Sequence, residues 1–241
     1  MLIETTIFDL LNTKRQELTQ FLLKYKFAIS EIETKMSILN EELRTLNDYN
    51  PIENITSRLK SPESLMNKVI KKGIDFELHT VEENIKDIAG IRITCSFISD
   101  IYEVYEMIRK QSDIDIIEVK DYIKNPKPNG YQSLHLIVQI PVFLSEGKEM
   151  VYAEIQIRTV AMDFWASLEH KIFYKYNGEV PQRIKDELLS TALRSAELDR
   201  QMEKLNIEVN AIKDKARIEQ SIITDDQSSK IQTLLKQVTK K

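Results

Sequence analysis

Hydrophobic residues recur at intervals of three and four through about the first 48 positions of the chain. The repeating positions are Leu18, Phe21, Tyr25, Ala28, Ile32, Leu39, Leu43 and Leu46. This spacing gathers the apolar side chains into one stripe and predicts a long amphipathic helix. The helix should end at Asn50, because the residue before a proline disfavours helical backbone. A stripe of this length predicts packing against the rest of the chain or against another subunit.

Through the middle of the chain, apolar and polar residues alternate with the two-residue period of half-buried strands. We predict strands at about 87–97, 115–123, 133–140 and 150–158, with a helix over 99–110. The side chains expected to face a core are Ile91, Ile93, Cys95, Phe97, Ile117, Val119, Leu134, Leu136, Val138, Ile140, Val151, Ala153, Ile155 and Ile157. The alternation therefore predicts a sheet with one apolar face and one polar face.

Helical spacing returns over 159–176 and again from about 181. In the second of these segments the apolar residues step by four and three, as in a short coiled-coil seam. They are Leu198, Met202, Leu205, Val209, Ile212 and Ala216. Together with the N-terminal stripe, this seam predicts self-association. Residues from about 219 are polar, and we expect them to fray.

These patterns predict an α/β chain of the α+β type, with a mixed, mainly antiparallel β-sheet of about five strands flanked by helices. The predicted parts are an N-terminal helical region at 1–50, a sheet domain at 51–180, C-terminal amphipathic helices at 181–218 and a polar tail at 219–241. The chain has 241 residues, of which 42% are hydrophobic, and this suffices for one core with helical extensions.

Composition and charge exclude several classes of protein. A net charge of −4 argues against a protein that coats nucleic acid with its whole surface, although it is compatible with local basic patches. The single cysteine, Cys95, excludes an intrachain disulfide framework and a cysteine-rich zinc site. We find neither a signal peptide nor a segment long enough to span a bilayer. We therefore expect a cytoplasmic protein without a membrane or DNA partner.

The stretch 120–135, which joins two predicted strands, differs most from generic protein sequence. Two prolines and the pair Asn129–Gly130 mark a turn. Its basic and aromatic candidates are Lys120, Lys124, Lys127 and Tyr131. Cations beside an aromatic plane suit the phosphates and the base of a nucleotide. A solvated hairpin connection with a structural tyrosine explains the stretch equally well.

A second group of cations surrounds the predicted start of a helix. Ser61, followed by Pro62 and Glu63, has the form of an N-cap and first helical turn, and Gly73 marks the end. The polar side chains near this start are those of Arg58, Lys60, Ser64 and Lys68. Backbone N–H groups, a hydroxyl and cations that converge on a helix start form an anion site. A capped surface helix with scattered basic residues is the alternative.

The polar face of the predicted sheet carries residues with chemical potential. These are Arg92 and Thr94, Lys120 and Tyr122, Ser133 and His135, and Glu154, Gln156 and Arg158. The helix that follows adds Asp163, Glu169 and His170. Asp87 and Glu154 would be two carboxylates among many cations, which is the composition of a metal-assisted phosphoryl or pyrophosphoryl site. His135 alone is not diagnostic, because a lone histidine is more often structural than catalytic.

Four motifs, taken in order, resemble the synthetase domain of RelA/SpoT-type alarmone synthetases. They are Ser57-Arg-Leu-Lys-Ser61 with Ser64 and Lys68, Asp87-Ile-Ala-Gly-Ile-Arg92, Lys120-Asp-Tyr-Ile123 with Pro126-Lys-Pro-Asn-Gly-Tyr-Gln-Ser-Leu-His135, and Glu154-Ile-Gln-Ile-Arg-Thr159. The resemblance covers about 50–180. It implies a small, stand-alone alarmone synthetase with a nucleotidyltransferase-like sheet and long terminal helices, without a hydrolase domain before it or regulatory domains after it.

The resemblance also implies an activity and a set of residue roles. The activity is transfer of pyrophosphate from ATP to the 3′-hydroxyl of GDP or GTP, which gives AMP and ppGpp or pppGpp, with Mg²⁺ as cofactor. Asp87 and Glu154 would be catalytic and would bind the metal. The residues implied for ATP are Arg58, Lys60, Ser64, Lys68 and Arg92, and those implied for GDP or GTP are Lys120, Lys127, Tyr131, His135, Gln156, Asp163, Glu169 and His170. A homotetramer is the implied assembly.

Some alternatives remain open on the sequence. Gln132 and Leu134 stand where many stand-alone synthetases carry Arg and Tyr, which leaves the choice between GDP and GTP open. One rival function is pyrophosphorylation of the 3′ end of tRNA, against which the net charge of −4 counts. Another is a catalytically silent nucleotide- or RNA-binding scaffold, against which the two carboxylates Asp87 and Glu154 count. RNA is therefore a compatible partner that nothing in the sequence requires.

Overall fold

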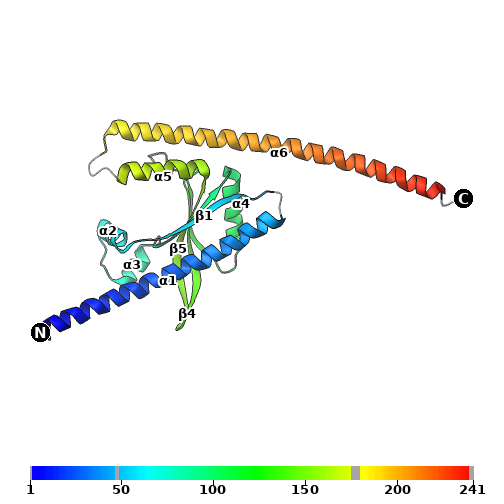
Figure 1. Cartoon of the computed structure of the whole chain (residues 1–241). Coiled ribbons are helices and arrows are strands. Elements are labelled where there is room, and N and C mark those ends of the chain that lie inside the picture. The colour runs from blue at the N-terminus through cyan, green and yellow to red at the C-terminus, as the bar shows by residue number, and fades with distance from the viewer. Residues whose placement is uncertain (1, 47–48, 175–179, 239–241) are drawn as a thin grey trace.

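A five-stranded sheet forms the centre of the computed structural model, which describes residues 2–46, 49–174 and 180–238 (Figure 1). Its strands are β1 (Ile52–Leu59), β2 (Ala89–Cys95), β3 (Asp115–Asp121), β4 (Leu134–Leu144) and β5 (Gly147–Thr159). The strand order is β1-β2-β5-β4-β3. Strands β2 and β5 run parallel, whereas the other neighbouring pairs run antiparallel. This confirms the mixed, mainly antiparallel sheet that the sequence predicts.

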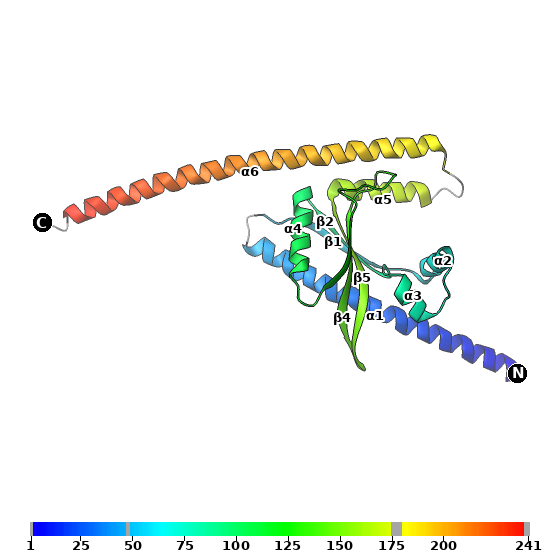
Figure 2. The ribbon, with the colours of Figure 1, turned by 180° about the vertical axis from the view of Figure 1, so that it is seen from behind.

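Helices surround this sheet on both sides. The described ranges contain α1 (Leu2–Leu46), α2 (Pro62–Lys72), α3 (Leu78–Asn84), α4 (Ile98–Arg109), α5 (Val160–Tyr174) and α6 (Gln182–Val238). The long helices α1 and α6 lie on opposite sides of the sheet and extend beyond it in opposite directions (Figures 1 and 2). Among the described residues, no helix is both long and apolar enough to cross a membrane.

The predicted N-terminal stripe packs largely against the sheet of its own chain. Its buried members are Phe21, Tyr25, Ala28, Ile32 and Leu43, and Leu18 and Leu39 are partly buried. Met36, which the stripe did not include, is fully buried beside them. Leu46 is exposed, because it lies at the last residue of α1 beyond the packed region. We expected the helix to end at Asn50; residues 49 and 50 are not helical, and residues 47–48 lie outside the described residues.

The predicted core positions of β2, β4 and β5 are buried, but those of β3 are not. Ile117 is 53% exposed and Val119 is 43% exposed, so the prediction that both face a core is wrong. A register shift between Ile116 and Glu118 leaves Ile117 as an extra residue. Val119 pairs with Leu136, but β3 is the outer strand of the sheet and has a neighbour on one side only.

Local signals located α2 well but missed two elements. The Ser61 Oγ accepts a hydrogen bond from the backbone N–H of Ser64, and Gly73 ends the helix with φ 65°. Strand β1 was missed because Ile52 is its one buried residue, so its sequence shows no clear alternation. Helix α3 was missed because it has seven residues and no side-chain N-cap.

Helix α6 continues to Val238 in the structure, where we expected a frayed tail from about 219. The segment 219–238 contains no glycine or proline, so nothing in the sequence interrupts helix propagation there. The predicted seam is exposed at Leu198, Met202, Leu205, Val209 and Ile212. The side chain of Ala216 lies outside the described residues, as do residues 239–241 of the predicted tail and residues 175–176 of the predicted helix over 159–176.

The first turns of α6 bind the sheet domain at several points. Trp165 Nε1 donates hydrogen bonds to the carbonyl oxygen of Leu188 and to Thr191 Oγ1, at 3.2 and 3.1 Å. Thr159 Oγ1 donates to Asp199 Oδ2 at 2.5 Å. Farther along, Glu203 Oε2 accepts the first two backbone N–H groups of α4 at 2.8 and 3.2 Å. These contacts attach α6 to α5, β5 and α4.

Candidate functional site

Polar side chains lie in register across the face of the sheet opposite the apolar core. One row crosses all five strands and consists of Thr56, Arg92, Gln156, His135 and Lys120. In the neighbouring row, Arg58 pairs with Gly90, and Gly90 pairs with Glu154. Because alternate residues of a strand share a face, most of the predicted polar positions converge on one surface. The polar face that the alternation predicts is thus matched by the strand register.

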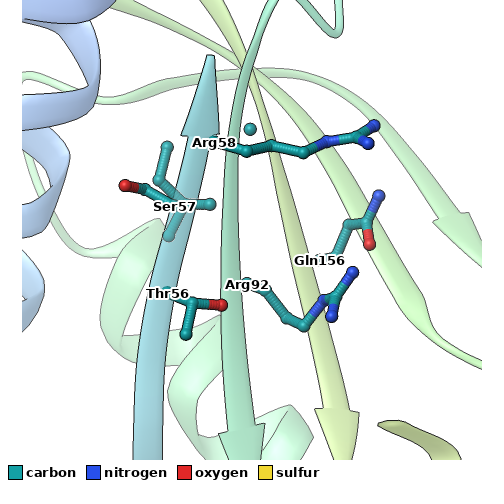
Figure 3. A pocket seen from close by; sticks show the side chains of 7 residues that line it. Thr56, Ser57, Arg58, Arg92 and Gln156 are labelled. Carbon is teal, nitrogen blue, oxygen red and sulfur yellow. The ribbon is translucent and has the colours of Figure 1, made fainter. Parts of the chain in front are cut away.

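Two arginines line a cavity of about 150 Å³ at the β1 side of this surface. Figure 3 shows Arg58 of β1 and Arg92 of β2 running side by side toward the position of Gln156 on β5. A planar guanidinium stacks readily on an aromatic ring, so two of them at one cavity suit a flat base. Burial lowers the pKa of Arg92 from its ordinary value, and the neighbouring charge of Arg158 lowers it further.

A larger cavity of about 380 Å³ adjoins the first. It shares Arg58, Arg92 and Gln156 with the smaller cavity. Its other lining residues include Tyr131, Arg158, Glu169 and His170. The two cavities therefore adjoin each other at Arg58, Arg92 and Gln156, the last of which lies in the middle of the polar row.

Asp87 lies two residues before the start of β2 and forms ion pairs with two lysines. Lys68 Nζ of α2 lies 2.6 Å from Asp87 Oδ2, and Lys60 Nζ lies 3.1 Å from the same oxygen. Burial raises the pKa of Asp87, but the two ammonium groups outweigh it and hold this pKa below its ordinary value. Ser64 is at the start of α2, where its Oγ accepts a hydrogen bond from Ser61 Oγ at 2.9 Å. Two of the four predicted anion-binding residues, Lys60 and Lys68, thus contact one carboxylate.

The second oxygen of Asp87 has the character of a metal ligand. Asp87 Oδ1 is buried and has no hydrogen-bond partner in the structure. Within the described residues, no three His, Cys, Asp or Glu side chains form a group that could hold a metal ion by themselves. Mg²⁺ is commonly held by one or two carboxylates together with substrate phosphates. The unpaired Oδ1 fits this mode of binding, in which substrate phosphates supply further ligands. The described residues do not offer a metal site made from protein side chains alone.

Glu154 is the second carboxylate, and a chain of hydrogen bonds connects it with Tyr131. His135 Nδ1 lies 3.1 Å from Glu154 Oε1, and Gln156 Nε2 donates to Glu154 Oε2 at 2.7 Å. On the other side of the imidazole, His135 Nε2 lies 2.7 Å from the Tyr131 hydroxyl. Because an ionised carboxylate only accepts, His135 Nδ1 is the donor to Glu154.

The charge state of Glu154 follows from these neighbours. Burial raises its pKa, but hydrogen bonding and charge from His135, together with the hydrogen bond from Gln156, lower it more. The net result is a pKa below the ordinary value, so the carboxyl is ionised at neutral pH. The negative charge of Asp87 raises the pKa of the same carboxyl to a smaller extent.

The loop before β4 places a lysine against two aromatic rings. Lys127 Nζ lies 4.6 Å from the ring centre of Tyr122 and 4.7 Å from that of Tyr131. Burial lowers the pKa of Lys127. Lys120 is farther out, on the edge strand, and forms an ion pair with Glu118 at 2.9 Å. Of the two predicted acceptor lysines, Lys127 is therefore the one that contacts Tyr131.

The same loop rests directly on α6. Gly130 has φ 85°, a left-handed conformation that favours glycine, and its backbone N–H donates to the carbonyl oxygen of Lys127 at 2.8 Å. A Cβ atom at Gly130 would lie 2.5 Å from the Cβ of Ala192 in α6. Asn129 Nδ2 donates to Glu169 Oε1 at 3.2 Å, which ties the loop to α5 as well.

Asp163 forms ion pairs with two arginines that line the larger cavity, Arg92 and Arg158. Asp163 Oδ1 lies 3.0 Å from Arg92 NH1 and 3.1 Å from Arg158 NH1. The carboxylate predicted to contact an acceptor is thus engaged by two arginines. The strand alternation predicts that Arg158 lies on the polar face, but an outward position in the sequence does not reveal which partners the fold brings to it, so no role was predicted for it.

Comparison with known proteins identifies the family. A family model described as "Region found in RelA / SpoT proteins" matches residues 57–179. The chain belongs to the RelA/SpoT family. GTP pyrophosphokinase YwaC of Bacillus subtilis strain 168 is 49% identical over 208 residues, which cover 86% of this chain and 99% of that protein. The resemblance stated from the four sequence motifs is confirmed.

Solved structures of RelA/SpoT relatives share the fold. Small alarmone synthetase 2 from Bacillus subtilis is 52% identical with a TM-score of 0.71, over 78% of this chain and 96% of that one. Small alarmone synthetase 1 from Bacillus subtilis, bound to its product pppGpp, is 37% identical with a TM-score of 0.76. That match covers 80% of this chain and 98% of the other.

Proposed function

We propose that this chain is a (p)ppGpp synthetase that transfers pyrophosphate from ATP to the 3′-hydroxyl of GDP or GTP. The observation that carries the proposal is the position of Gln156, which lines both cavities and donates a hydrogen bond to Glu154. Two nucleotides in adjoining cavities would meet beside an ionised carboxylate. The relatives named GTP pyrophosphokinase, and the relative bound to pppGpp, support the same reaction.

ATP belongs in the smaller cavity and beside the start of α2. Arg58 and Arg92 would stack on the adenine from two sides. The phosphates would reach Lys60, Lys68 and the backbone N–H groups near Ser64. Cations and a helix N-terminus are suited to a polyphosphate, because both supply positive potential where the negative charge is concentrated.

The acceptor belongs in the larger cavity. Tyr131 would stack on the guanine, and Lys127, which already contacts the Tyr131 ring, would bind phosphate oxygens. Lys120 and His135 lie on the adjoining edge of the polar row and extend the same positive surface. The remaining acceptor candidates are Gln156, Asp163, Glu169 and His170. Of these, Asp163 would act through the two arginines that it already holds.

In the transfer step, the acceptor 3′-oxygen attacks the β-phosphorus of ATP. The new bond joins the 3′-oxygen to the β-phosphorus, the bond from the β-phosphorus to the α–β bridging oxygen breaks, and AMP leaves. Glu154, ionised and hydrogen-bonded through His135 and Gln156, accepts the proton of the 3′-hydroxyl. Two polyanions repel each other, so most of the catalytic effect comes from holding them in line.

We include Mg²⁺ in the proposed site. Asp87 would hold it through Oδ1, with Glu154 as the second protein ligand. When bound, the ion neutralises negative charge on the phosphates of ATP. Lys60 and Lys68 would then turn from Asp87 to those phosphates.

A product assay tests the function. The protein is incubated with ATP, Mg²⁺ and either GDP or GTP, and nucleotides are separated by anion-exchange chromatography. We expect AMP together with an equal amount of ppGpp or pppGpp. Absence of both products would refute the function. A parallel reaction contains radiolabelled ATP and tRNA, and transfer of the label to tRNA but not to GDP or GTP would favour tRNA as the acceptor. Comparison of the two guanine nucleotides also decides the preference that Gln132 and Leu134 leave open.

We also propose that the chain self-associates, in the cytoplasm where its nucleotide substrates are made, as a homotetramer. The exposed seam Leu198, Met202, Leu205, Val209 and Ile212 supports this, because apolar side chains in a helical row favour pairing with another helix. Light scattering coupled to size-exclusion chromatography measures the assembly. A monomer at micromolar concentration would contradict the proposal.

A further inference from the structure

Arg158 is the most deeply buried cation in the described part of the site. It lies near the end of β5 and is 4% exposed. Its NH2 donates to the Tyr131 hydroxyl and to Gln156 Oε1, both at 2.6 Å, and its NH1 donates to Asp163 Oδ1 at 3.1 Å. Burying a guanidinium is unfavourable unless its donors are satisfied. A cation with these three partners is well placed to order the groups around it.

The partner of greatest consequence is Tyr131. Its hydroxyl accepts a hydrogen bond from Arg158 and also lies 2.7 Å from His135 Nε2. The guanidinium carbon of Arg158 also lies 5.1 Å from the centre of the Tyr131 ring. Burial raises the pKa of Tyr131, so the hydroxyl is protonated at neutral pH. The ring is thereby held at both its hydroxyl and its face.

We propose that Arg158 is a positioning residue for the acceptor nucleotide, acting through the hydroxyl of Tyr131. The inference rests on the proposed function, in which Tyr131 stacks on the guanine. A ring fixed before the ligand arrives loses less side-chain entropy on binding than a free one. Arg158 therefore lowers the Kd of the acceptor nucleotide without contacting that nucleotide.

Asp163 keeps Arg158 in this role. The same carboxylate oxygen binds Arg92 NH1 at 3.0 Å, so one acid anchors Arg158 of the larger cavity and Arg92, which lines both cavities. Direct contact between Arg158 and the acceptor's phosphates is the rival explanation. The Arg158 side chain is 5% exposed, and its Nε is buried without a hydrogen-bond partner, so it offers little surface for such contact.

The test is a double-mutant cycle between Arg158→Met and Tyr131→Phe. Calorimetry measures the Kd of GDP and, separately, of a non-hydrolysable ATP analogue. Loss of a hydrogen bond to a charged group raises the Kd by about tenfold or more. We expect each single variant to weaken GDP by about that factor and the double variant to be no weaker than roughly the worse single variant. The ATP analogue should change by much less.

Two further variants make the test specific. Arg109→Met removes an exposed arginine whose ion pair is with Glu106 on its own helix, and it should leave both affinities unchanged. Arg158→Lys retains the buried charge and should recover part of the lost GDP affinity. If Arg158→Met fails to fold, as judged by circular dichroism, the cycle is run with Arg158→Lys instead.

The outcomes separate this inference from the proposed function. Wild-type GDP affinity in Arg158→Met, or independent and additive effects of the two substitutions, would overturn the positioning role. Wild-type protein that binds no GDP and forms no product would instead overturn the function. A loss confined to the ATP analogue would show that Arg158 serves the other cavity, which also contradicts the inference.

Discussion

Lys68 Nζ lies 2.6 Å from Asp87 Oδ2, so an ammonium group is bound to the carboxylate that we assign to Mg²⁺. Lys60 Nζ reinforces this arrangement from 3.1 Å. A divalent cation approaching Asp87 without a nucleotide would meet the repulsion of both lysines. With ATP present, the phosphates give the ammonium groups another partner. The geometry therefore favours arrival of the metal together with ATP.

Lys68→Met should separate these two effects. Removing the ammonium should raise the KM for ATP by about tenfold, because a charged hydrogen bond to phosphate is lost. It should also tighten binding of Mn²⁺ to the nucleotide-free protein, measured by electron paramagnetic resonance. Lys71→Met, at an exposed position of the same helix, is the matched control. Unchanged Mn²⁺ affinity in Lys68→Met would mean that this lysine does not oppose the metal.

Glu154→Gln should nearly abolish turnover. The variant lacks the carboxylate that we propose as the acceptor of the 3′-hydroxyl proton, and general-base catalysis contributes about 100-fold or more. Affinities for GDP and for an ATP analogue should stay within a few-fold, because the side chain keeps its size. Glu149→Gln controls for the same change at an exposed site of the same strand. Wild-type kcat in Glu154→Gln would remove this residue from the chemistry.

Gly130→Ala should damage the acceptor site through α6. The new Cβ would meet the Cβ of Ala192 at 2.5 Å, so the loop must move by roughly 1 Å, a displacement that can reduce kcat/KM by up to about 100-fold. The acceptor KM is the measurement. Gly73→Ala is the control, because φ 65° there carries the same backbone cost with no atom within 4 Å.

A second substitution sharpens this prediction. Ala192→Gly removes the atom that the new methyl group would meet. The double variant Gly130→Ala, Ala192→Gly should recover much of the lost kcat/KM and retain the backbone cost at Gly130 and the tight 3.2 Å contact with Leu189 Cδ1. If the double variant were as impaired as Gly130→Ala, contact with α6 would not be the cause.

Asp199→Asn should change how stability depends on pH. Burial raises the pKa of Asp199 above its ordinary value of 3.8, so the folded state binds this proton more tightly than the unfolded state. The contribution of Asp199 to the free energy of unfolding is therefore fully present below pH 3.8 and is lost as pH rises through the pKa of the folded state. Asparagine has no such loss and can still accept the hydrogen bond from Thr159 through its amide oxygen.

The measurement is the difference in Tm between Asp199→Asn and wild type across pH. We expect almost no difference near pH 3.8 and a growing advantage of the variant toward neutral pH. Asp186→Asn, at an exposed position of α6, should show no such trend. An advantage that shrinks as pH rises would contradict the raised pKa of Asp199.

The sequence predicted features that depend on near neighbours. The N-cap at Ser61 and the stop at Gly73 are local signals, and the structure has both. The alternation in β5 correctly put Glu154, Gln156 and Arg158 on one face, because strand geometry fixes that face. Ile117 was misplaced because a bulge depends on the partner strand and leaves no mark in a single sequence.

Contacts between distant segments were beyond sequence reasoning. The role proposed for Arg158 depends on Tyr131 and Asp163, which reach it from a loop and from the next helix. The packing of Gly130 on Ala192 depends on how α6 returns over the sheet. Neither set of contacts corresponds to a spacing or pattern that can be recognised in the sequence, so both are seen only in the folded structure.

The attachment of α6 has a consequence for where the smallest working protein ends. The family match stops at residue 179, before α6 begins at Gln182. Yet the hydrogen bonds of Trp165, Thr159 and the start of α4 all terminate on residues between Leu188 and Glu203. A protein cut at 180 would lose the part of α6 that includes Ala192 and packs against Gly130 in the loop before β4. A protein cut shortly after Glu203 would keep it. The minimal catalytic unit therefore includes α6 from Gln182 to at least Glu203.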